Sequence, residues 1–106
     1  MAKRAAKNWF VYILRCADGT LYTGITKDLA RRTQQHNKGT ASRYTRSRRP
    51  VKLVYQEPQR SQSLALKREA AIKKLTRRQK LAMIRGASFR EMANSSPGLQ
   101  PSGTLG

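Results

Sequence analysis

The sequence predicts a single α+β domain, in which a small three-stranded, mainly antiparallel sheet is flanked by helices. The first indication is the stretch WFVYILRCADGTLYTGIT, where apolar and polar residues alternate on both sides of Asp18-Gly19, the typical signal of a β-hairpin. The second is VKLVYQE at residues 51–57, which alternates with period two and ends before Pro58. The third is that helical segments follow the second and third strands, so helices are available to cover the sheet.

The strands and the first helix have clear local boundaries. The expected strands are residues 9–16, 20–25 and 51–57. The first helix is expected at Asp28–Lys38, because Asp28 is a suitable N-cap and Gly39 is a suitable C-terminal stop. The stretch GTASRYTRSRRP that follows is interpreted as a loop carrying four arginines.

Three further helices are expected in the second half of the chain. One covers about residues 63–75. The sequence TRRQ, which begins at Thr76, is a capping box that starts the next helix, and Gly86 is expected to end it. The sequence SFRE, which begins at Ser88, is a second capping box and predicts a short C-terminal helix.

The element order is therefore strand, strand, helix, strand, helix, helix, with a short helix at the end. The main domain covers residues 8–86, and residues 87–94 form a short helical extension. The basic segment 1–7 and the charge-free Ser, Pro and Gly segment 95–106 are expected to be flexible tails.

The charge balance indicates a polyanionic partner. Twenty-three Lys and Arg against five Asp and Glu give a formal net charge of +18 and a pI near 11.5. A small folded chain this basic repels itself unless a polyanion neutralises it, and nucleic acid is the commonest such partner. On charge alone, a non-catalytic binding protein is the simplest interpretation.

Several other classes are excluded by composition. Cys16 is the only cysteine and His36 the only histidine, so neither an intramolecular disulfide nor a Cys/His zinc site is expected. The apolar run after the basic start is interrupted at Arg15, and no segment approaches the length of a membrane span. We therefore expect a cytoplasmic protein without a membrane partner.

Two helices carry polar residues where apolar ones are expected. Leu29, Arg32, Thr33 and His36 share one face of the first helix, yet three of these four are polar. Either this helix packs only through Leu29, or Arg32 and His36 point at a site; a solvated basic helix is a third alternative.

In the later helix, Glu69 is the only acid among seven bases in residues 67–80. It is expected either to form an i,i+4 salt bridge with Lys73 or to hold a hard cation. Spacing alone does not choose between the two.

Four segments in register resemble one nuclease family. Phe10-Val11-Tyr12 followed by Tyr22-Thr23-Gly24 resembles the paired motif of the GIY-YIG nuclease superfamily, although the first triplet has kept only its tyrosine. KDLARRTQQHNKG resembles the helix with that family's arginine, which is Arg32 here, and REAAIKKL resembles the helix with its metal-binding glutamate, which is Glu69. The resemblance is strongest to the small stand-alone YhbQ-like bacterial proteins.

This resemblance implies a DNA endonuclease that uses one divalent ion, Mg²⁺ or Mn²⁺. Arg32 would bind the scissile phosphate, and Glu69 would hold the metal. Either Tyr12 or Tyr22 would take the proton from the attacking water, and we expect nearby positive charge to lower the pKa of that tyrosine. His36 is expected either to support the site by hydrogen bonding or simply to pack the helix.

The hairpin must be irregular if both tyrosines serve one site. A two-residue loop at Asp18-Gly19 would place Tyr12 opposite Ile25 and would leave the two phenols on opposite faces of the sheet. We therefore predict one extra loop residue, with Gly19 at positive φ as in a G1-type bulge. Asp18, Gly19 and Gly24 are thus expected to have structural roles.

The remaining basic residues predict a DNA surface. The expected DNA-binding residues are Arg43, Tyr44, Arg46, Arg48, Arg49, Lys52, Lys73, Lys74, Arg77 and Arg78. Tyr44 is expected either to stack on a base or to pack below the loop. Phosphate contacts of this kind give affinity without sequence preference and weaken with salt. We expect a monomer that acts in DNA repair or on branched or single-stranded DNA.

Overall fold

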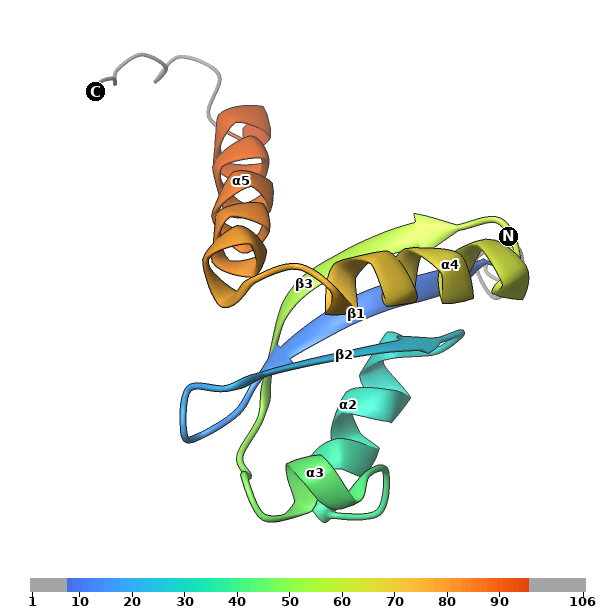
Figure 1. Cartoon of the computed structure of the whole chain (residues 1–106), viewed down its shortest axis with the longest axis vertical. Coiled ribbons are helices and arrows are strands. Elements are labelled where there is room, and N and C mark those ends of the chain that lie inside the picture. Colours follow the sequence, from blue (N-terminus) through green and yellow to red (C-terminus); the bar gives the residue numbers. More distant parts are fainter. Residues whose placement is uncertain (1–7, 96–106) are drawn as a thin grey trace. The chain divides into compact units, whose positions relative to one another are not determined.

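The computed structural model describes residues 8–95, with side chains described for residues 8–86. The chain forms two compact units, one ending at Leu75 and one beginning at Thr76. The first unit contains the sheet and three helices, and the second contains a single helix (Figure 1).

The elements of the first unit are β1 (Trp9–Arg15), β2 (Leu21–Thr26), α2 (Leu29–Lys38), α3 (Arg43–Arg46), β3 (Lys52–Gln59) and α4 (Gln62–Lys73). The second unit contains α5 (Arg77–Ser95). The strands form a three-stranded sheet in the order β2-β1-β3, and both strand pairs are antiparallel. The predicted α+β class and element order are therefore confirmed.

The α2 boundaries follow the predicted caps. The Asp28 carboxylate accepts a hydrogen bond from the backbone N–H of Arg31 at 3.1 Å. Gly39 has φ 83°, and its N–H donates to the carbonyl of His36. Glycine adopts this left-handed conformation without steric cost, so the helix ends where expected.

Three boundaries differ from the expectation. Gly86 does not end a helix, because α5 continues through the capping sequence that begins at Ser88; an interior glycine costs only about 1 kcal/mol relative to alanine. Ser42 caps the short helix α3 inside the expected loop. β3 continues past Pro58, which an edge strand tolerates. The predicted tails lie outside the described residues, except Ser95, which ends α5.

The hairpin has the predicted extra loop residue. Tyr12 pairs with Gly24, and Leu14 pairs with Tyr22. The Cys16 N–H donates to the Thr20 carbonyl at 2.9 Å, which leaves a three-residue loop at residues 17–19. Gly19 in this loop has φ 86°, as predicted. Tyr12 and Tyr22 consequently lie on the same face of the sheet.

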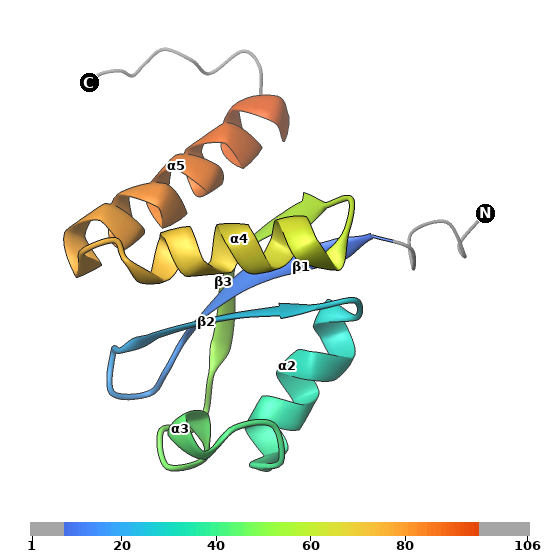
Figure 2. The same ribbon diagram turned by 45° about the vertical axis from the view of Figure 1, so that its right-hand side comes forward.

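Helices cover both faces of the sheet (Figure 2). On the α2 face, the core contains Tyr12, Leu14, Cys16 and Val51, with Tyr22, Leu29 and Leu53 packed against it. On the α4 face, the alternation of β1 places Val11 and Ile13, both fully buried, against a helix that buries Ala65 and Ile72. Within the described chain, no helix combines the length and apolar character needed to cross a bilayer.

Candidate nuclease site

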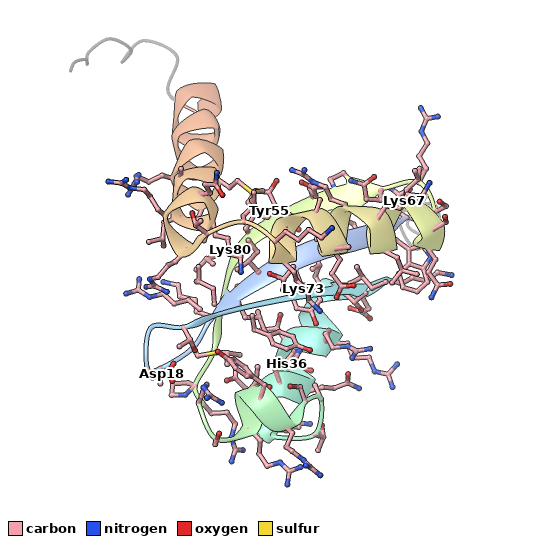
Figure 3. All side chains as sticks on the ribbon, viewed as in Figure 1. Asp18, His36, Tyr55, Lys67, Lys73 and Lys80 are labelled. Carbon is pink, nitrogen blue, oxygen red and sulfur yellow. The ribbon has the colours of Figure 1, made fainter. Side chains whose placement is uncertain are left out.

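His36 is the centre of the candidate site, where it is 1% exposed between α2 and the sheet (Figure 3). Its Nε2 lies 3.0 Å from the Tyr12 hydroxyl oxygen, and its Nδ1 lies 2.8 Å from the Thr45 hydroxyl oxygen. The Thr45 hydroxyl in turn donates to the Ser42 carbonyl at 3.3 Å.

The direction of this hydrogen-bond chain follows from its end. A threonine hydroxyl has one proton, and that of Thr45 is given to the backbone carbonyl of Ser42. Thr45 therefore accepts the proton of His36 Nδ1–H, which leaves Nε2 as the acceptor for the Tyr12 hydroxyl. These hydrogen bonds fix one tautomer of a neutral His36, in which the unprotonated Nε2 accepts from the Tyr12 hydroxyl.

Tyr22 lies beside this chain and extends it into an aromatic cluster. The Tyr22 ring centroid is 5.1 Å from that of His36, in an edge-to-face arrangement. Tyr44 stacks on Tyr22 at 5.8 Å, and the Arg48 guanidinium lies 3.9 Å from the Tyr44 ring centroid. Tyr44 is 38% exposed, so part of its ring stays accessible beside Tyr22, and its stacking on a base remains a prediction.

Gly24 explains how Tyr12 reaches His36. Tyr12 lies across the backbone of its pairing partner Gly24, and a Cβ at that position would meet the Tyr12 hydroxyl oxygen at 2.5 Å and Cζ at 2.7 Å. Real Cβ atoms essentially never come this close to another heavy atom. Glycine therefore leaves the space that the phenol occupies on its way to the imidazole.

Arg32 lies one helical turn before His36 on α2. Its positive charge lowers the pKa of both Tyr12 and His36, which places it close to the hydrogen-bonded pair. Among the described residues, neither an ion pair nor a side-chain hydrogen bond holds its guanidinium. The arginine is therefore available for an anionic ligand.

Glu69 approaches from α4, with its side chain 18% exposed. Its carboxylate pairs with Lys73 at 3.3 Å, so the salt-bridge alternative of the sequence analysis is present. Its negative charge also raises the pKa of Tyr12, although less than Tyr22 does. The electrostatic field at the Tyr12 hydroxyl thus includes Tyr22, Arg32 and Glu69, but no described contact joins Glu69 directly to the other three.

The expectation that positive charge lowers the pKa of the catalytic tyrosine is wrong for Tyr12. Burial is the main cause that raises its pKa well above the ordinary value; Tyr22 raises it further, and the opposing effect of Arg32 is smaller. Burial, followed by Arg32, lowers the pKa of His36. At neutral pH, Tyr12 is therefore protonated and His36 neutral.

The candidate site offers one carboxylate, that of Glu69, so it suits a metal ion that needs few protein ligands. Among the described residues, no group of three or more His, Cys, Asp or Glu comes together. A site for Mg²⁺ or Mn²⁺ that takes most of its ligands from water and phosphate needs only one or two carboxylates, and Glu69 can supply one.

The predicted DNA-binding residues divide into free and engaged side chains. Arg43, Arg46 and Lys52 are exposed. Arg48 pairs with Asp18 at 3.1 Å and donates to the Tyr44 carbonyl, while Arg49 donates to the Arg46 carbonyl. Lys74 is exposed on the first unit, whereas the exposed Arg77 and Arg78 belong to the second unit.

Two positions that hold the site together were not predicted from the sequence. Thr45 sets the His36 tautomer. The only sequence signal for this contact is Ser42, a typical helix cap three residues earlier, which could have suggested an ordered turn in the arginine-rich segment. The Asn37 side chain bonds the backbone of Val51 twice, at 2.7 and 3.1 Å, and so joins the end of α2 to the start of β3. No local pattern signals this contact.

Comparisons with known proteins identify the family. The GIY-YIG catalytic domain family matches residues 8–82. A UPF0213 protein of Desulfotalea psychrophila is 56% identical over 80 residues, which cover 74% of this chain and 73% of the relative. A UPF0213 protein of Staphylococcus aureus is 54% identical over 76 residues, which cover 72% of this chain and 93% of the relative.

A similar fold has also been solved. The solution structure of a protein from E. faecalis has 40% sequence identity and a TM-score of 0.55, and the match covers 78% of this chain and 88% of that one. Since the family match spans most of the chain and close relatives share more than half of their aligned residues, the chain belongs to the GIY-YIG family, together with the small bacterial UPF0213 proteins.

Proposed function

We propose that this protein is a metal-dependent DNA endonuclease that hydrolyses phosphodiester bonds. The observation that carries the proposal is the buried Tyr12–His36 hydrogen bond beside the unpaired guanidinium of Arg32. A histidine that only packs a helix does not need an unpaired arginine beside it. Hydrolysis of a phosphodiester, in contrast, needs a proton acceptor next to a cation that binds the phosphate.

The proton of the attacking water would travel through Tyr12 to His36. Tyr12 cannot act as a base alone, because its raised pKa keeps it protonated at neutral pH. When the Tyr12 oxygen accepts the water proton, its own hydroxyl proton passes to His36 Nε2 over the 3.0 Å hydrogen bond. Thr45 keeps Nδ1–H in place during the transfer. Of the two tyrosines, this geometry favours Tyr12 as the proton-accepting group.

Arg32 and Glu69 would act on the phosphate. The Arg32 guanidinium can offer two parallel N–H donors to the phosphate oxygens and stabilise the charge that grows there in the transition state. Glu69 would hold the Mg²⁺ or Mn²⁺ ion, which neutralises charge on the phosphate and on the leaving oxygen when it is bound. For this, the Glu69 carboxylate must be shared with or released by Lys73.

The exposed cations would hold the DNA backbone. Arg43, Arg46 and Lys52 on the first unit are free for phosphate contacts, which are independent of base sequence. We place the activity in DNA repair or in the processing of branched or single-stranded DNA, in the cytoplasm, and with the protein as a monomer. Because these phosphate contacts are electrostatic, DNA binding should weaken steeply as the salt concentration rises.

A plasmid-nicking assay tests the proposal. The full chain should nick supercoiled DNA with Mg²⁺ or Mn²⁺ and should be inactive in EDTA. Glu69→Ala and Arg32→Ala should both lose cleavage, and Arg32→Lys, which keeps the charge but loses the planar fork, should remain strongly impaired. Glu91→Ala is the matched control, because it removes the same charge from the second unit. Cleavage that persists in EDTA or in Glu69→Ala would contradict the assignment.

One observation favours a second candidate, a non-catalytic nucleic-acid-binding protein. Lys73 already neutralises Glu69 in the structure, as expected if the carboxylate only relieves repulsion among the cations of α4. On this alternative, the wild-type chain binds DNA without cutting it under any metal condition. Glu69→Ala should then bind DNA as tightly as the wild type or more tightly.

A further inference from the structure

A groove lies beside Arg32 at the end of the hairpin away from the Asp18-Gly19 turn. There β1 begins, β2 ends and α2 starts. The groove is lined by Trp9, Ile25, Lys27, Arg31, Arg32 and Gln35, among others. Arg32 also belongs to the candidate nuclease site, so the groove and that site share this residue.

The charge of the groove selects an anionic ligand. Lys27, Arg31 and Arg32 line it, and Lys27 and Arg31 are exposed. Asp28 is the only acid among the lining residues, and its carboxylate is engaged in capping α2 through the Arg31 N–H. Three cations therefore outnumber a single carboxylate, and the net charge of the lining is positive.

The aromatic wall makes the groove more selective than a simple anion site. Trp9 is half-buried, and the Lys27 ammonium lies 5.5 Å from the centroid of the indole ring. This ammonium lies over the ring, so a base that stacks on the indole takes its place there while the ammonium moves to the phosphate of the same nucleotide. A nucleotide has both a base to stack and a phosphate to pair, whereas inorganic phosphate would leave the indole unused.

We propose that this groove binds one unpaired nucleotide of the DNA strand, with its base on Trp9 and its phosphate on Lys27 and Arg31, adjacent to the phosphate that Arg32 contacts. The placement of this nucleotide next to the cleaved phosphate rests on the proposed nuclease function. The binding of a nucleotide in the groove does not. Since a base within a duplex cannot present its face to an indole, the groove selects single-stranded, frayed or branched DNA as the substrate class.

The fluorescence of Trp9 provides a direct test, because Trp9 is the only tryptophan in the chain. The full chain in EDTA is titrated with a short oligothymidylate and with an abasic phosphodiester of the same length, and binding is followed in parallel by anisotropy of labelled strands. We expect both strands to bind through their charge, but only oligothymidylate to quench Trp9 strongly; a duplex of equal length should quench weakly. Equal quenching by the abasic strand, or unchanged emission at saturation with oligothymidylate, would overturn the proposal.

Variants separate stacking from charge. Trp9→Leu should weaken oligothymidylate binding by about tenfold and leave abasic binding unchanged, while Trp9→Phe should retain most of the preference. Lys27→Ala should weaken both strands alike. If Trp9→Leu does not fold, the wild-type quenching and Trp9→Phe still decide the question.

Failure of this inference and failure of the nuclease proposal are distinguishable. If wild-type protein nicks plasmid with Mg²⁺ but Trp9→Leu binds oligothymidylate normally, the nucleotide groove is wrong and the nuclease stands. If oligothymidylate quenches Trp9 selectively but no metal supports nicking, the groove stands and the nuclease is wrong.

Discussion

Glu57 and Glu69 are equally buried, with 17% and 18% of their side chains exposed, yet their surroundings differ sharply. Glu57 accepts hydrogen bonds from the Tyr55 hydroxyl, the Gln59 amide and the Arg68 guanidinium. Glu69, the next residue along α4 after Arg68, has one described partner, the exposed Lys73 at 3.3 Å.

This difference is the one expected between a structural carboxylate and the metal-binding role that we propose for Glu69. Burial alone raises the pKa of Glu57, but the bonds from Arg68, Tyr55 and Gln59 outweigh it and leave that pKa below its ordinary value. Both of its oxygens are already engaged by protein donors. The Glu69 side chain is buried to a similar degree but has fewer hydrogen-bond and ion-pair partners to offset the loss of water. This is unfavourable for folding alone. It suits a carboxylate that has to receive a cation.

The largest expected effect comes from exchanging the two carboxylates for amides. Glu69→Gln should lower the nicking rate by about a thousandfold, since several kcal/mol of transition-state stabilisation are lost with the metal. Its thermal midpoint should remain close to that of the wild type. Glu57→Gln should do the reverse, lowering the free energy of unfolding by about 1–3 kcal/mol while the folded fraction cleaves normally.

Nicking assays and thermal unfolding on the same preparations check this pair. The comparison fails if Glu57→Gln abolishes cleavage without affecting stability, or if Glu69→Gln destabilises the fold as much as Glu57→Gln does.

Gly24→Ala should have the next largest effect, because the new Cβ would lie 2.5 Å from the Tyr12 hydroxyl oxygen. Relief of this overlap moves Tyr12 away from His36, so we expect about a hundredfold loss of nicking and a cost of about 1–3 kcal/mol in unfolding free energy. Gly86→Ala is the matched control, since its Cβ would have nothing within 4 Å. A Gly24→Ala variant with normal activity would exclude Tyr12 from the proton path.

Thr45→Val should have a smaller effect, of about tenfold on the nicking rate. Valine has the same shape but cannot accept the proton of His36 Nδ1–H, so the tautomer that accepts from Tyr12 is no longer fixed. Thr45→Ser should restore the rate. The acidic limb of the pH–rate profile, which reports His36, should shift in Thr45→Val and not in Thr45→Ser; an unchanged profile would contradict the role of Thr45.

The smallest effect concerns stability against pH. Both His36 and Glu57 have pKa values below those of the unfolded chain, so the unfolded state binds protons first and stability falls as the pH falls. The loss attributable to His36 should begin near its unfolded pKa of about 6.5, and the loss attributable to Glu57 near its unfolded pKa of about 4.5. Urea unfolding at several pH values checks this: His36→Gln should lack the upper step, and Glu57→Gln the lower one.

Features that depend on a few neighbouring residues could be predicted from the sequence. The turn at Asp18-Gly19 and the Asp28 and Gly39 caps follow from rules that act within a few residues. The shared face of Tyr12 and Tyr22 does not, because the local signal alone favours a two-residue loop; it was predicted from the requirement that both tyrosines serve one site. The expected helix end at Gly86 was wrong, because a preference of about 1 kcal/mol does not decide a helix boundary by itself.

The chemistry of the site depended on burial and on distant contacts, which the sequence does not show. The pKa of Tyr12 rises because its hydroxyl is enclosed, and no charge pattern reveals this enclosure. The contact between His36 and Thr45 requires the arginine-rich segment to fold back onto α2. The convergence of Arg32 and Glu69 on a phosphate and a metal remains a prediction for the nicking experiment.

The three-residue loop of the hairpin also limits how this gene can change over time. Removing or adding one residue between Cys16 and Thr20 would shift the pairing of β2 by one position and turn Tyr22 to the opposite side of the sheet. The identity of most loop residues is free to drift, but their number is not. Point mutation and single-codon deletion in this segment should therefore have very different evolutionary fates.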